Sequence, residues 1–428
     1  MNVAIVGYGI EGRASYAYWK KKGDNVTIVD QKSGITHVPG DAQTILGKDA
    51  LKNLGEFDMV IRTPQMNPNV LRETKKVWSA TNEFFQHCPA PIIGVTGTKG
   101  KGTTCSLIAA MLEQAGKTVH LLGNIGRPAL GVLPIIHSQD IVVFELSSFQ
   151  LWDLEYSPHI AMVLMIDNDH LDVHADMNDY VLAKSNIARH QNENDVLIYH
   201  PTNQLSKQIA DCSPARKLRY MNDEGAHLKN DEIIIDEQSI CLVKDIKLIG
   251  KHNVENVCAA VTAAWRYSKD TAAIRRAIQQ FSGLPHRLEF VRSVKGVDYY
   301  NDSYSSTPAA TIAAISTFEQ SITLVVGGQD KHGDFHKLAE QISQNQNVDN
   351  VVIYGAVRHK IKDALKNIKT AAIQVIDSVS LHDIVAAAQE VSQPGSVVIF
   401  SPGASSFDMF KNFNDRGEQF KDVVEALS

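Results

Sequence analysis

The sequence predicts an α/β protein with three domains: an N-terminal Rossmann-like domain, a central P-loop domain with a mostly parallel sheet, and a C-terminal Rossmann-like domain. Short apolar runs alternate with helical patterns along most of the 428 residues, as parallel sheets covered by helices require. Two glycine-rich loops, at residues 7–12 and 97–102, each follow an apolar run and precede a helical pattern. Segments that contain proline and glycine place the domains at residues 1–88, 89–284 and 285–428.

The composition is that of a globular protein with several hydrophobic cores. Hydrophobic residues make up 44% of the chain, and the formal net charge of -6 offers no broad basic surface to nucleic acid. The five cysteines are scattered without a CxxC pair, which argues against a zinc cluster or a disulfide framework. No apolar run reaches the roughly 18 residues of a membrane span, and the first residues lack a basic leader. We therefore expect a cytoplasmic protein without membrane insertion. We also expect it to be a monomer.

The first residues form a nucleotide-binding fingerprint. The apolar run Val3–Val6 leads into Gly7-Tyr-Gly9-Ile-Glu-Gly12, a helical pattern, a second apolar run over Asn25–Val29, and Asp30. This order is typical of a Rossmann opening, in which a helix N-terminus holds phosphate and the acid binds a ribose hydroxyl. The pattern does not select the nucleotide, because NAD and a nucleoside diphosphate on another group would use the same amides and the same acid.

A phosphate-binding loop opens the central domain. It follows the apolar pair Ile92-Ile93 and precedes the helical run Cys105–Glu113. Glycines let backbone amides close around phosphate oxygens, and Lys101 carries a positive charge to the β and γ phosphates. The alternative is an ordinary glycine-rich turn. The residues expected to bind ATP are Gly97, Thr98, Lys99, Gly100, Lys101, Gly102, Thr103 and Thr104. Because Gly102 follows the lysine, the hydroxyl that faces a metal is expected to come from Thr103 or Thr104.

Further apolar runs predict the remaining elements. In the central domain, we expect strands at Ile141–Phe144 and Ile160–Ile166 and a helix over Asn253–Trp265. The polar stretch from about 195 to 250, which contains Glu232–Asp236, is expected to form a small antiparallel extension. Strands of the third domain are expected at Thr323–Val326, Val351–Tyr354 and Ser396–Phe400.

Three residues of the central domain are candidates for catalysis. Glu145 ends one expected strand and His170 follows the next, at the sheet edge where ligands of parallel sheets bind. A carboxylate there can hold a divalent metal, although Glu145 could also cap a turn and His170 could be structural. Lys184 lies in the helical run Tyr180–Ile187, on a face expected to turn inward. The residues alone nevertheless favour a solvated lysine there, because an unpaired buried lysine is costly.

The chain resembles the Mur ligases of peptidoglycan synthesis over its whole length, and most of all the branch that adds glutamate. Nine landmarks occur in family order: Thr96–Lys101, Gly123–Gly126, Glu145–Leu151, Asp169–Asp172, Gly250–Asn256, Leu284–Arg287, Asn301–Ser303, Gly327–Lys331 and Ser401–Asp408.

The resemblance implies a role for each candidate. Lys101 and Thr103 would hold ATP phosphates and metal, Glu145 one Mg²⁺, and His170 with Lys184 a second Mg²⁺, with Lys184 carbamylated by CO2. Other residues near ATP would be Asn253 and Asn256 at adenine, Arg287 on the phosphate side and Asp302 at ribose. The implied contacts of the UDP-sugar are Gly9, Ile10, Glu11, Gly12, Asp30, Gln31, Lys32 and Asn124, so that the N-terminal fingerprint binds UDP and NAD is disfavoured.

The implied reaction is ATP-dependent amide formation. ATP would convert the carboxylate of UDP-N-acetylmuramoyl-L-alanine into an acyl phosphate, and the amino group of glutamate would displace phosphate. The products would be ADP, inorganic phosphate and the new amide. Arg287 and Asp302 belong to the third domain, so domain closure would complete the site.

The chain departs from the family pattern at two positions. Tyr304 stands where the D-glutamate-adding branch has a lysine near the carboxylate of the amino acid, and a phenol cannot neutralise a carboxylate. The sequence Thr307-Pro308 is similar to variant ligases that add L-glutamate. Other glutamate-side positions match, so we expect glutamate as acceptor, with D favoured over L; the acceptor-side residues are Tyr304, Ser306, Lys331, Ser406 and Phe413. The second departure, Gly102, is shared with folylpolyglutamate synthases.

Three other functions stay open at this point. A folylpolyglutamate synthase-like ligase would lack a separate N-terminal domain, which residues 1–88 are expected to form. A non-catalytic nucleotide-binding homologue would not need Lys101, Glu145, His170 and Lys184 together. An NAD-dependent dehydrogenase would leave the phosphate loop unexplained.

Overall fold

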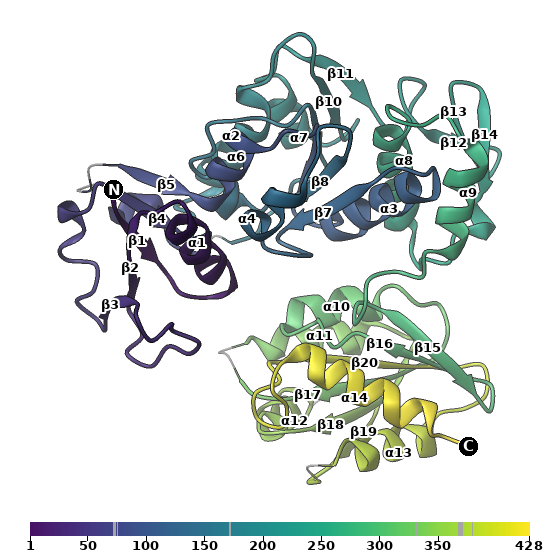
Figure 1. The fold of residues 1–428 in the computed structure, drawn as a ribbon. Helices are drawn as coiled ribbons and strands as arrows, with labels where there is room; N and C mark the ends of the chain where they lie inside the picture. Colours follow the sequence, from purple (N-terminus) through teal and green to yellow (C-terminus); the bar gives the residue numbers. More distant parts are fainter. Residues whose placement is uncertain (72–73, 75, 171–172, 331–332, 367–370, 379) are drawn as a thin grey trace. The chain divides into compact units, whose positions relative to one another are not determined.

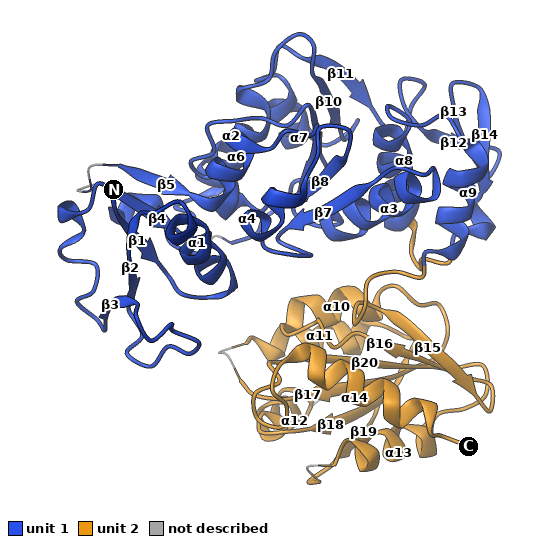
Figure 2. Cartoon of the chain, viewed as in Figure 1, with its two compact units in different colours: residues 1–246, 252–281 blue, residues 247–251, 282–428 orange. Residues whose placement is uncertain are grey.

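A computed structural model describes residues 1–71, 74, 76–170, 173–330, 333–366, 371–378 and 380–428 of the chain. They form two compact units: unit 1 comprises residues 1–246 and 252–281, and unit 2 comprises residues 247–251 and 282–428 (Figure 2). Unit 1 contains two parallel sheets and unit 2 one mostly parallel sheet, each with helices packed beside it (Figure 1). The predicted α/β class, with three parts that are each centred on a sheet, is confirmed. The predicted limits at 88/89 and 284/285 stay a prediction.

The first sheet of unit 1 has the strand order of half a Rossmann fold. Its order is β3-β2-β1-β4-β5 and all pairs are parallel. The strands are β1 (Asn2–Val6), β2 (Asn25–Asp30), β3 (Gln43–Leu46), β4 (Met59–Arg62) and β5 (Val77–Ser79). Helix α1 (Ile10–Lys21) connects β1 with β2 and buries Tyr16 and Trp19. Helix α2 (Ala80–His87) follows β5 and begins at Ser79, whose hydroxyl accepts a hydrogen bond from the Asn82 N–H at 3.1 Å.

The second sheet of unit 1 has six parallel strands in the order β11-β10-β9-β6-β8-β7. These are β6 (Ile92–Thr96), β7 (Val119–Gly123), β8 (Ile141–Glu145), β9 (Ile160–Val163), β10 (Val196–Tyr199) and β11 (Arg216–Arg219). The helices of this part are α3 (Lys101–Gln114), α4 (Ala129–Val132), α5 (Ser148–Leu151), α6 (Met177–Arg189), α7 (Gln204–Ala210), α8 (Lys251–Ala264) and α9 (Thr271–Gln280). The predicted strand at 141–144 and the helices at 105–113, 180–187 and 253–265 are confirmed within a few residues.

Two predictions for this part were wrong in detail. The strand expected over residues 160–166 ends at Val163: the Leu164 N–H still donates to the Thr96 carbonyl at the end of β6, but the Met165 carbonyl accepts from the Thr98 N–H of the phosphate loop, both at 2.9 Å. The stretch 195–250 is not wholly antiparallel, because β10 and β11 extend the parallel sheet. Only β12 (His227–Lys229), β13 (Glu232–Ile235) and β14 (Gln238–Leu242) form the expected antiparallel sheet.

A shared core joins the two sheets of unit 1. The rings of Phe84 and Phe85 in α2 each lie 5.5 Å from the ring of Phe144 in β8. Arg62, at the carboxyl end of β4, is fully buried: its Nε donates to Asp153 at 2.6 Å, and its Nη2 donates to Asp153 and, at 2.9 Å, to the Phe149 carbonyl. A buried guanidinium is tolerated because these acceptors replace its water.

Unit 2 has one six-stranded sheet in the order β15-β16-β20-β17-β18-β19, parallel except for the antiparallel edge strand β15. Its strands are β15 (Glu289–Val294), β16 (Val297–Asn301), β17 (Ile322–Gly327), β18 (Val348–Tyr354), β19 (Ala372–Val375) and β20 (Val397–Gly403). Its helices are α10 (Pro308–Ile315), α11 (Phe335–Gln344), α12 (Arg358–Leu365), α13 (Leu381–Val391) and α14 (Phe413–Glu425). Two apolar clusters pack on this sheet, and the three strands expected here are confirmed. No helix among the described residues is long and apolar enough to cross a membrane.

We predict that Arg62→Ala destabilises unit 1 by about 3 kcal/mol or more, because it leaves the Asp153 carboxylate and buried carbonyls without their partner. Urea unfolding followed by circular dichroism measures this as a lower midpoint. The matched control is Arg219→Ala. Arg219 lies in β11, and the substitution removes its solvent-exposed ion pair with Glu224. The control is expected to leave the midpoint nearly unchanged. Equal midpoints for the two variants would contradict a supporting role for Arg62.

Candidate functional site

The phosphate loop lies between β6 and α3, as the sequence predicts. Gly100 caps α3 with a left-handed backbone, at φ 82°, and a Cβ atom there would approach the Asn256 Oδ1 to 2.4 Å. Only glycine fits both demands without strain. The Asn256 side chain also accepts a hydrogen bond from the Thr104 hydroxyl at 3.5 Å and donates to the Asn253 Oδ1 at 3.0 Å. Helix α8 therefore supports the loop from behind, and the Thr104 hydroxyl is already engaged there.

Lys101 is held across its own loop. Its Nζ donates to the carbonyls of Gly97 and Thr98, each at 3.0 Å, and the side chain is only partly exposed. The positive charge therefore lies above the backbone turn that opens α3, where the helix N-terminus adds further positive potential. This arrangement suits the oxygens of a phosphate chain.

Thr98 ties the phosphate loop to the segment after β9. Its hydroxyl donates to the Asp167 carbonyl at 3.0 Å, accepts from the Asp167 N–H at 2.8 Å, and lies 3.1 Å from the Tyr180 hydroxyl. The side chain of Thr98 thus fixes loop geometry, and its backbone amide is bonded to Met165.

Lys184 is almost completely buried, unlike an ordinary surface lysine. Its side chain is 1% exposed, and its Nζ donates to the Thr96 hydroxyl at 3.2 Å and to the Gly97 carbonyl at 3.0 Å. The Nζ also lies 4.7 Å from the centre of the Tyr180 ring. Burial, reinforced by the positive charge of Lys101, holds the pKa of the Lys184 amine well below its usual value, while Asp169 and Glu145 act in the opposite direction. The interpretation of Lys184 as a solvated lysine was wrong.

Glu145 ends β8 beside this amine. Its side chain is 4% exposed, and its Oε1 accepts a hydrogen bond from the Asn124 amide at 3.2 Å. Its Oε2 is buried and has no hydrogen-bond partner in the described part of the chain. Asn124, predicted as a contact of the UDP-sugar, is bonded to Glu145 by its side chain and by its backbone N–H. A buried carboxylate oxygen without a donor fits a metal ligand, because a cation would replace its lost hydration.

His170 is more exposed than the other candidates. It has a left-handed backbone, at φ 53°, and its Nε2 lies 3.5 Å from the Asp169 Oδ2. Its ring is 4.9 Å from that of Phe149 in α5. A non-glycine residue in this conformation indicates a backbone that its surroundings impose.

His174, which sequence reasoning missed, anchors the same loop. Its ring stacks on that of Phe149 with 5.8 Å between centres, its Nδ1 lies 2.9 Å from the Asp179 Oδ2, and its Nε2 lies 3.0 Å from the Ser148 hydroxyl. These contacts bind the loop that carries His170 to α5, which follows Glu145, and to α6, which carries Lys184.

Two oxygen atoms of this site are suited to bind a divalent metal. No group of three or more His, Cys, Asp or Glu side chains suited to a metal occurs in the described residues. The unbonded oxygen of Glu145 and the hydroxyl of Thr103 do fit Mg²⁺, which usually takes one or two protein oxygens and completes its shell with water and phosphate.

The N-terminal fingerprint has the expected close packing. A Cβ atom on Gly12 would lie 1.9 Å from the Gly7 carbonyl oxygen, so α1 reaches β1 only because residue 12 is glycine. The carboxylate of Asp30 accepts from the Tyr8 N–H at 2.8 Å and from the Lys32 N–H at 2.9 Å. Glu11 lies in the first turn of α1, and burial raises its pKa to about 7. The predicted ligands Gly9, Ile10, Gln31 and Lys32 lie in the same two loops, and their UDP contacts stay a prediction.

In unit 2, Arg287 lies in a turn between two residues with left-handed backbones, His286 at φ 62° and Leu288 at φ 44°. Asp302, which directly follows β16, stabilises this turn: its Oδ1 accepts from the Leu288 N–H at 3.2 Å and its Oδ2 from the Ser401 hydroxyl at 2.7 Å. Burial raises the pKa of Asp302 to about 6, although these hydrogen bonds and Arg287 oppose the shift. Both oxygens of the predicted ribose ligand are thus used within unit 2.

The structure brings together two of the residues predicted for the acceptor. The rings of Tyr304 and Phe413 are perpendicular, with 5.3 Å between centres. Ser306 precedes α10 and is half-buried, and Ser406 follows β20 and is 3% exposed. Lys331 lies outside the described residues.

Two further buried residues support these sites and were not predicted. Tyr180 precedes Lys184 by four residues, so the helical period could have placed it on the same face. Arg416 in α14 is fully buried and donates to the Ser303 hydroxyl at 2.9 Å, the Ser303 carbonyl at 2.8 Å and the Ala404 carbonyl at 3.1 Å. No local pattern marks Arg416, because its partners lie far away in the sequence.

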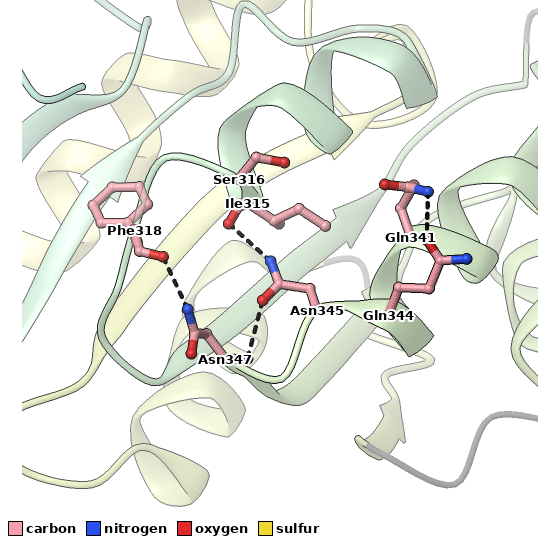
Figure 3. Close-up of a pocket in the computed structure, with 7 residues that line it drawn as sticks. All are labelled: Ile315, Ser316, Phe318, Gln341, Gln344, Asn345 and Asn347. Atoms are coloured by element: carbon pink, nitrogen blue, oxygen red, sulfur yellow. Dashed lines mark hydrogen bonds between the residues drawn. The ribbon is translucent and has the colours of Figure 1, made fainter. Parts of the chain in front are cut away.

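A cavity of about 250 Å³ in unit 2 lies apart from these residues. It is lined at the amino ends of β17 and β18, whereas the predicted ligands lie at the carboxyl ends (Figure 3). The amides of Asn345 and Asn347 donate to the carbonyls of Ile315 and Phe318, at 3.0 and 3.2 Å (Figure 3). These polar groups are satisfied by the protein itself.

Two protein families match the parts of the chain that contain the two sites just described. Residues 95–264 match the family described as Mur ligase middle domain, and residues 286–403 match the family described as Mur ligase, glutamate ligase domain. The solved structure of UDP-N-acetylmuramate-alanine ligase from Thermotoga maritima is similar at a TM-score of 0.61 and 17% identity, over 100% of this chain and 99% of that one. MurF ligase from the same organism, solved in complex with ADP, is similar at a TM-score of 0.58 and 17% identity, over 99% and 95%.

Curated relatives extend the similarity over the whole chain. UDP-N-acetylmuramoylalanine–D-glutamate ligase of Clostridium kluyveri is 36% identical over 99% of this chain and 96% of its own length. The enzyme of the same name from Clostridium perfringens is 34% identical over 100% and 97%. Because relatives more than 30% identical cover the whole chain and both family matches span the residues of these sites, the chain belongs to the Mur ligase family.

Proposed function

We propose that the chain is an ATP-dependent ligase that joins D-glutamate to UDP-N-acetylmuramoyl-L-alanine in cytoplasmic synthesis of peptidoglycan precursors. One observation carries the proposal: the phosphate loop, the buried amine of Lys184 and the unpaired oxygen of Glu145 meet at one edge of one sheet. The names of relatives that are 33–36% identical over the whole chain favour glutamate as acceptor and D over L. The separate first sheet disfavours a folylpolyglutamate synthase.

The domains divide this work in the proposal. Residues 1–88 bind the UDP-sugar through the loops 9–12 and 30–32, residues 89–284 bind ATP and metal, and residues 285–428 bind the acceptor. The first assignment is supported by the open space around Gly9, where no atom of the described residues other than its two chain neighbours lies within 4 Å of an added Cβ, and by the N-terminus of α1 that follows it. We propose no role for NAD.

Residues of the phosphate loop position the nucleotide. Lys101 lies against the carbonyls of Gly97 and Thr98, and it would neutralise charge on the transferring phosphoryl group. Asn253 and Asn256 are proposed on the adenine side, and Arg287 and Asp302 on the phosphate and ribose sides. Thr103 is favoured over Thr104 as the metal-facing hydroxyl because the Thr104 hydroxyl is engaged by Asn256.

Glu145, Thr103, His170 and Lys184 would hold Mg²⁺. When bound, Mg²⁺ neutralises the negative charge that the phosphoryl group develops during transfer. The protein's own part is to keep Glu145 dry and fixed by Asn124, so that one carboxylate oxygen stays available.

Lys184 is proposed to react with CO2. Its depressed pKa favours the neutral amine, whose lone pair forms a bond to the carbon of CO2 while one proton leaves the nitrogen. The resulting carbamate places a negative charge near the positive charge of Lys101, where the neutral amine carries none. Opposite charges at a buried site attract each other, so the carbamate is electrostatically favourable there.

The direct test is phosphate release with UDP-N-acetylmuramoyl-L-alanine, ATP and a panel of D and L amino acids. We expect release to require both co-substrates and to be fastest with D-glutamate, with alanine, lysine and diaminopimelate far slower. Release that is equally fast without the sugar nucleotide or the amino acid would exclude a ligase. If lysine or diaminopimelate were best, the acceptor assignment would fail.

Lys101→Ala should lower the rate of phosphate release by at least about 100-fold, because the transferring phosphoryl group loses its fixed positive charge. The measurement is steady-state phosphate release at saturating substrates. The matched control is Lys117→Ala, a lysine just beyond α3 that is exposed and outside the proposed site. The control should keep nearly full activity, and a Lys101→Ala enzyme that did so too would remove Lys101 from the mechanism.

Lys184→Ala should be nearly inactive and should regain part of its activity with short carboxylic acids, which can occupy the space of the carbamate. The measurement is phosphate release with and without acetate or propionate, together with a mass spectrum of the wild-type protein under CO2. Full activity of Lys184→Ala in CO2-free buffer would rule out the carbamate. Lys184→Met, which keeps an apolar stem without charge, serves as the control for folding.

A further inference from the structure

The guanidinium of Arg287 lies on the ring of Tyr304. The distance from its central carbon to the ring centre is 4.4 Å. Among the described residues the guanidinium forms no hydrogen bond and no ion pair, although its charge acts on the carboxyl group of Asp302, and the side chain is only partly exposed. An arginine in this condition keeps its N–H groups for an anion that comes from outside unit 2.

Tyr304 is itself fixed as a platform. Its backbone N–H donates to the His286 carbonyl at 2.9 Å, and its ring meets that of Phe413 edge to face at 5.3 Å. Its side chain is 46% exposed. One face of the ring therefore carries the guanidinium while Phe413 limits rotation of the ring.

The turn that presents Arg287 is held from several sides. The His286 N–H donates to the Glu289 carboxylate at 2.8 Å, and the Asn301 amide lies 2.9 Å from the His286 Nδ1. Burial lowers the pKa of His286, so its Nδ1 can accept from that amide at neutral pH. Two left-handed residues beside Arg287 cost free energy, and such strain persists only where surrounding contacts impose it. The backbone and the ring thus fix the arginine together.

We propose that Tyr304 is a positioning residue for Arg287, whose guanidinium binds the phosphoryl group during formation of the acyl phosphate, and that Tyr304 does not bind the acceptor amino acid. This inference rests on the proposed function. It assigns Tyr304 to formation of the acyl phosphate, whereas the sequence placed Tyr304 among the residues that bind the amino acid in the later step. Stacking on the ring holds the guanidinium plane in one orientation. The N–H groups can therefore bind phosphoryl oxygens with little further loss of side-chain conformational entropy. The hydroxyl of Tyr304 has no part in this role.

The test compares the ring with the hydroxyl before any amino acid is present. Wild-type protein, Tyr304→Phe and Tyr304→Leu are mixed with ATP and UDP-N-acetylmuramoyl-L-alanine without glutamate, and the acyl phosphate formed in a single turnover is trapped by borohydride reduction. Tyr304→Phe should form it within about twofold of the wild-type rate, and Tyr304→Leu about tenfold more slowly, as the loss of a partly buried cation–π contact implies. The matched control is Phe290→Leu, another exposed aromatic residue of unit 2, which should match wild type.

A double-mutant cycle keeps the result independent of folding. If Tyr304 acts through Arg287, then Tyr304→Leu should have little further effect in an Arg287→Ala background. The proposal is overturned if Tyr304→Phe loses as much as Tyr304→Leu, if the two substitutions are additive, or if Tyr304→Leu leaves acyl phosphate formation unchanged and raises only the KM for glutamate. Absence of ligation by the wild-type protein would instead count against the proposed function.

Discussion

The bonds between the phosphate loop and the segment after β9 determine the geometry of the central site. Parallel strands end at one edge, so β6, β8 and β9 deliver the phosphate loop, Glu145 and the loop of His170 to the same place. Thr98 then bonds to Asp167 and Tyr180, and Lys184 bonds to Thr96 and Gly97. Because the buried amine of Lys184 bonds to both Thr96 and Gly97, it helps to fix the start of the phosphate loop.

Helix α5 extends these contacts toward the first sheet. Arg62 bonds to the Phe149 carbonyl, and the ring of the same Phe149 contacts His170 and His174. A single short helix directly after Glu145 thus contacts the end of β4 on one side and the proposed metal-binding loop on the other. In a packed interior such contacts transmit small shifts, because side chains cannot move without displacing neighbours.

The sequence predicts local features well and long-range partners poorly. Strand order along the chain, the phosphate loop and the inward face of α6 follow from periodicity and glycine spacing, which act over a few residues. The burial of Lys184 does not follow, because its partners Thr96 and Gly97 are 88 and 87 residues away. The partners of Arg62 and Arg416 are similarly distant, at 91 and 113 residues for Asp153 and Ser303. Strand ends are also uncertain, as β9 shows, since a loop that competes for backbone hydrogen bonds can end a strand early.

Tyr304 replaces a repulsive interaction with Arg287 by an attractive one, in addition to removing the positive charge of a lysine. A lysine at this position would place an ammonium group near the Arg287 guanidinium, and two cations a few ångströms apart repel each other at a half-buried site. The aromatic ring attracts the guanidinium instead and needs no counter-ion. The acceptor amino acid in turn lacks the ammonium group that a lysine at position 304 would offer to one of its carboxylates. Discrimination between D- and L-glutamate then depends on which carboxylate oxygens of the wrong isomer are left without a hydrogen-bond donor. The donors that remain in unit 2 are neutral hydroxyls and other cations, and their positions determine which isomer binds better.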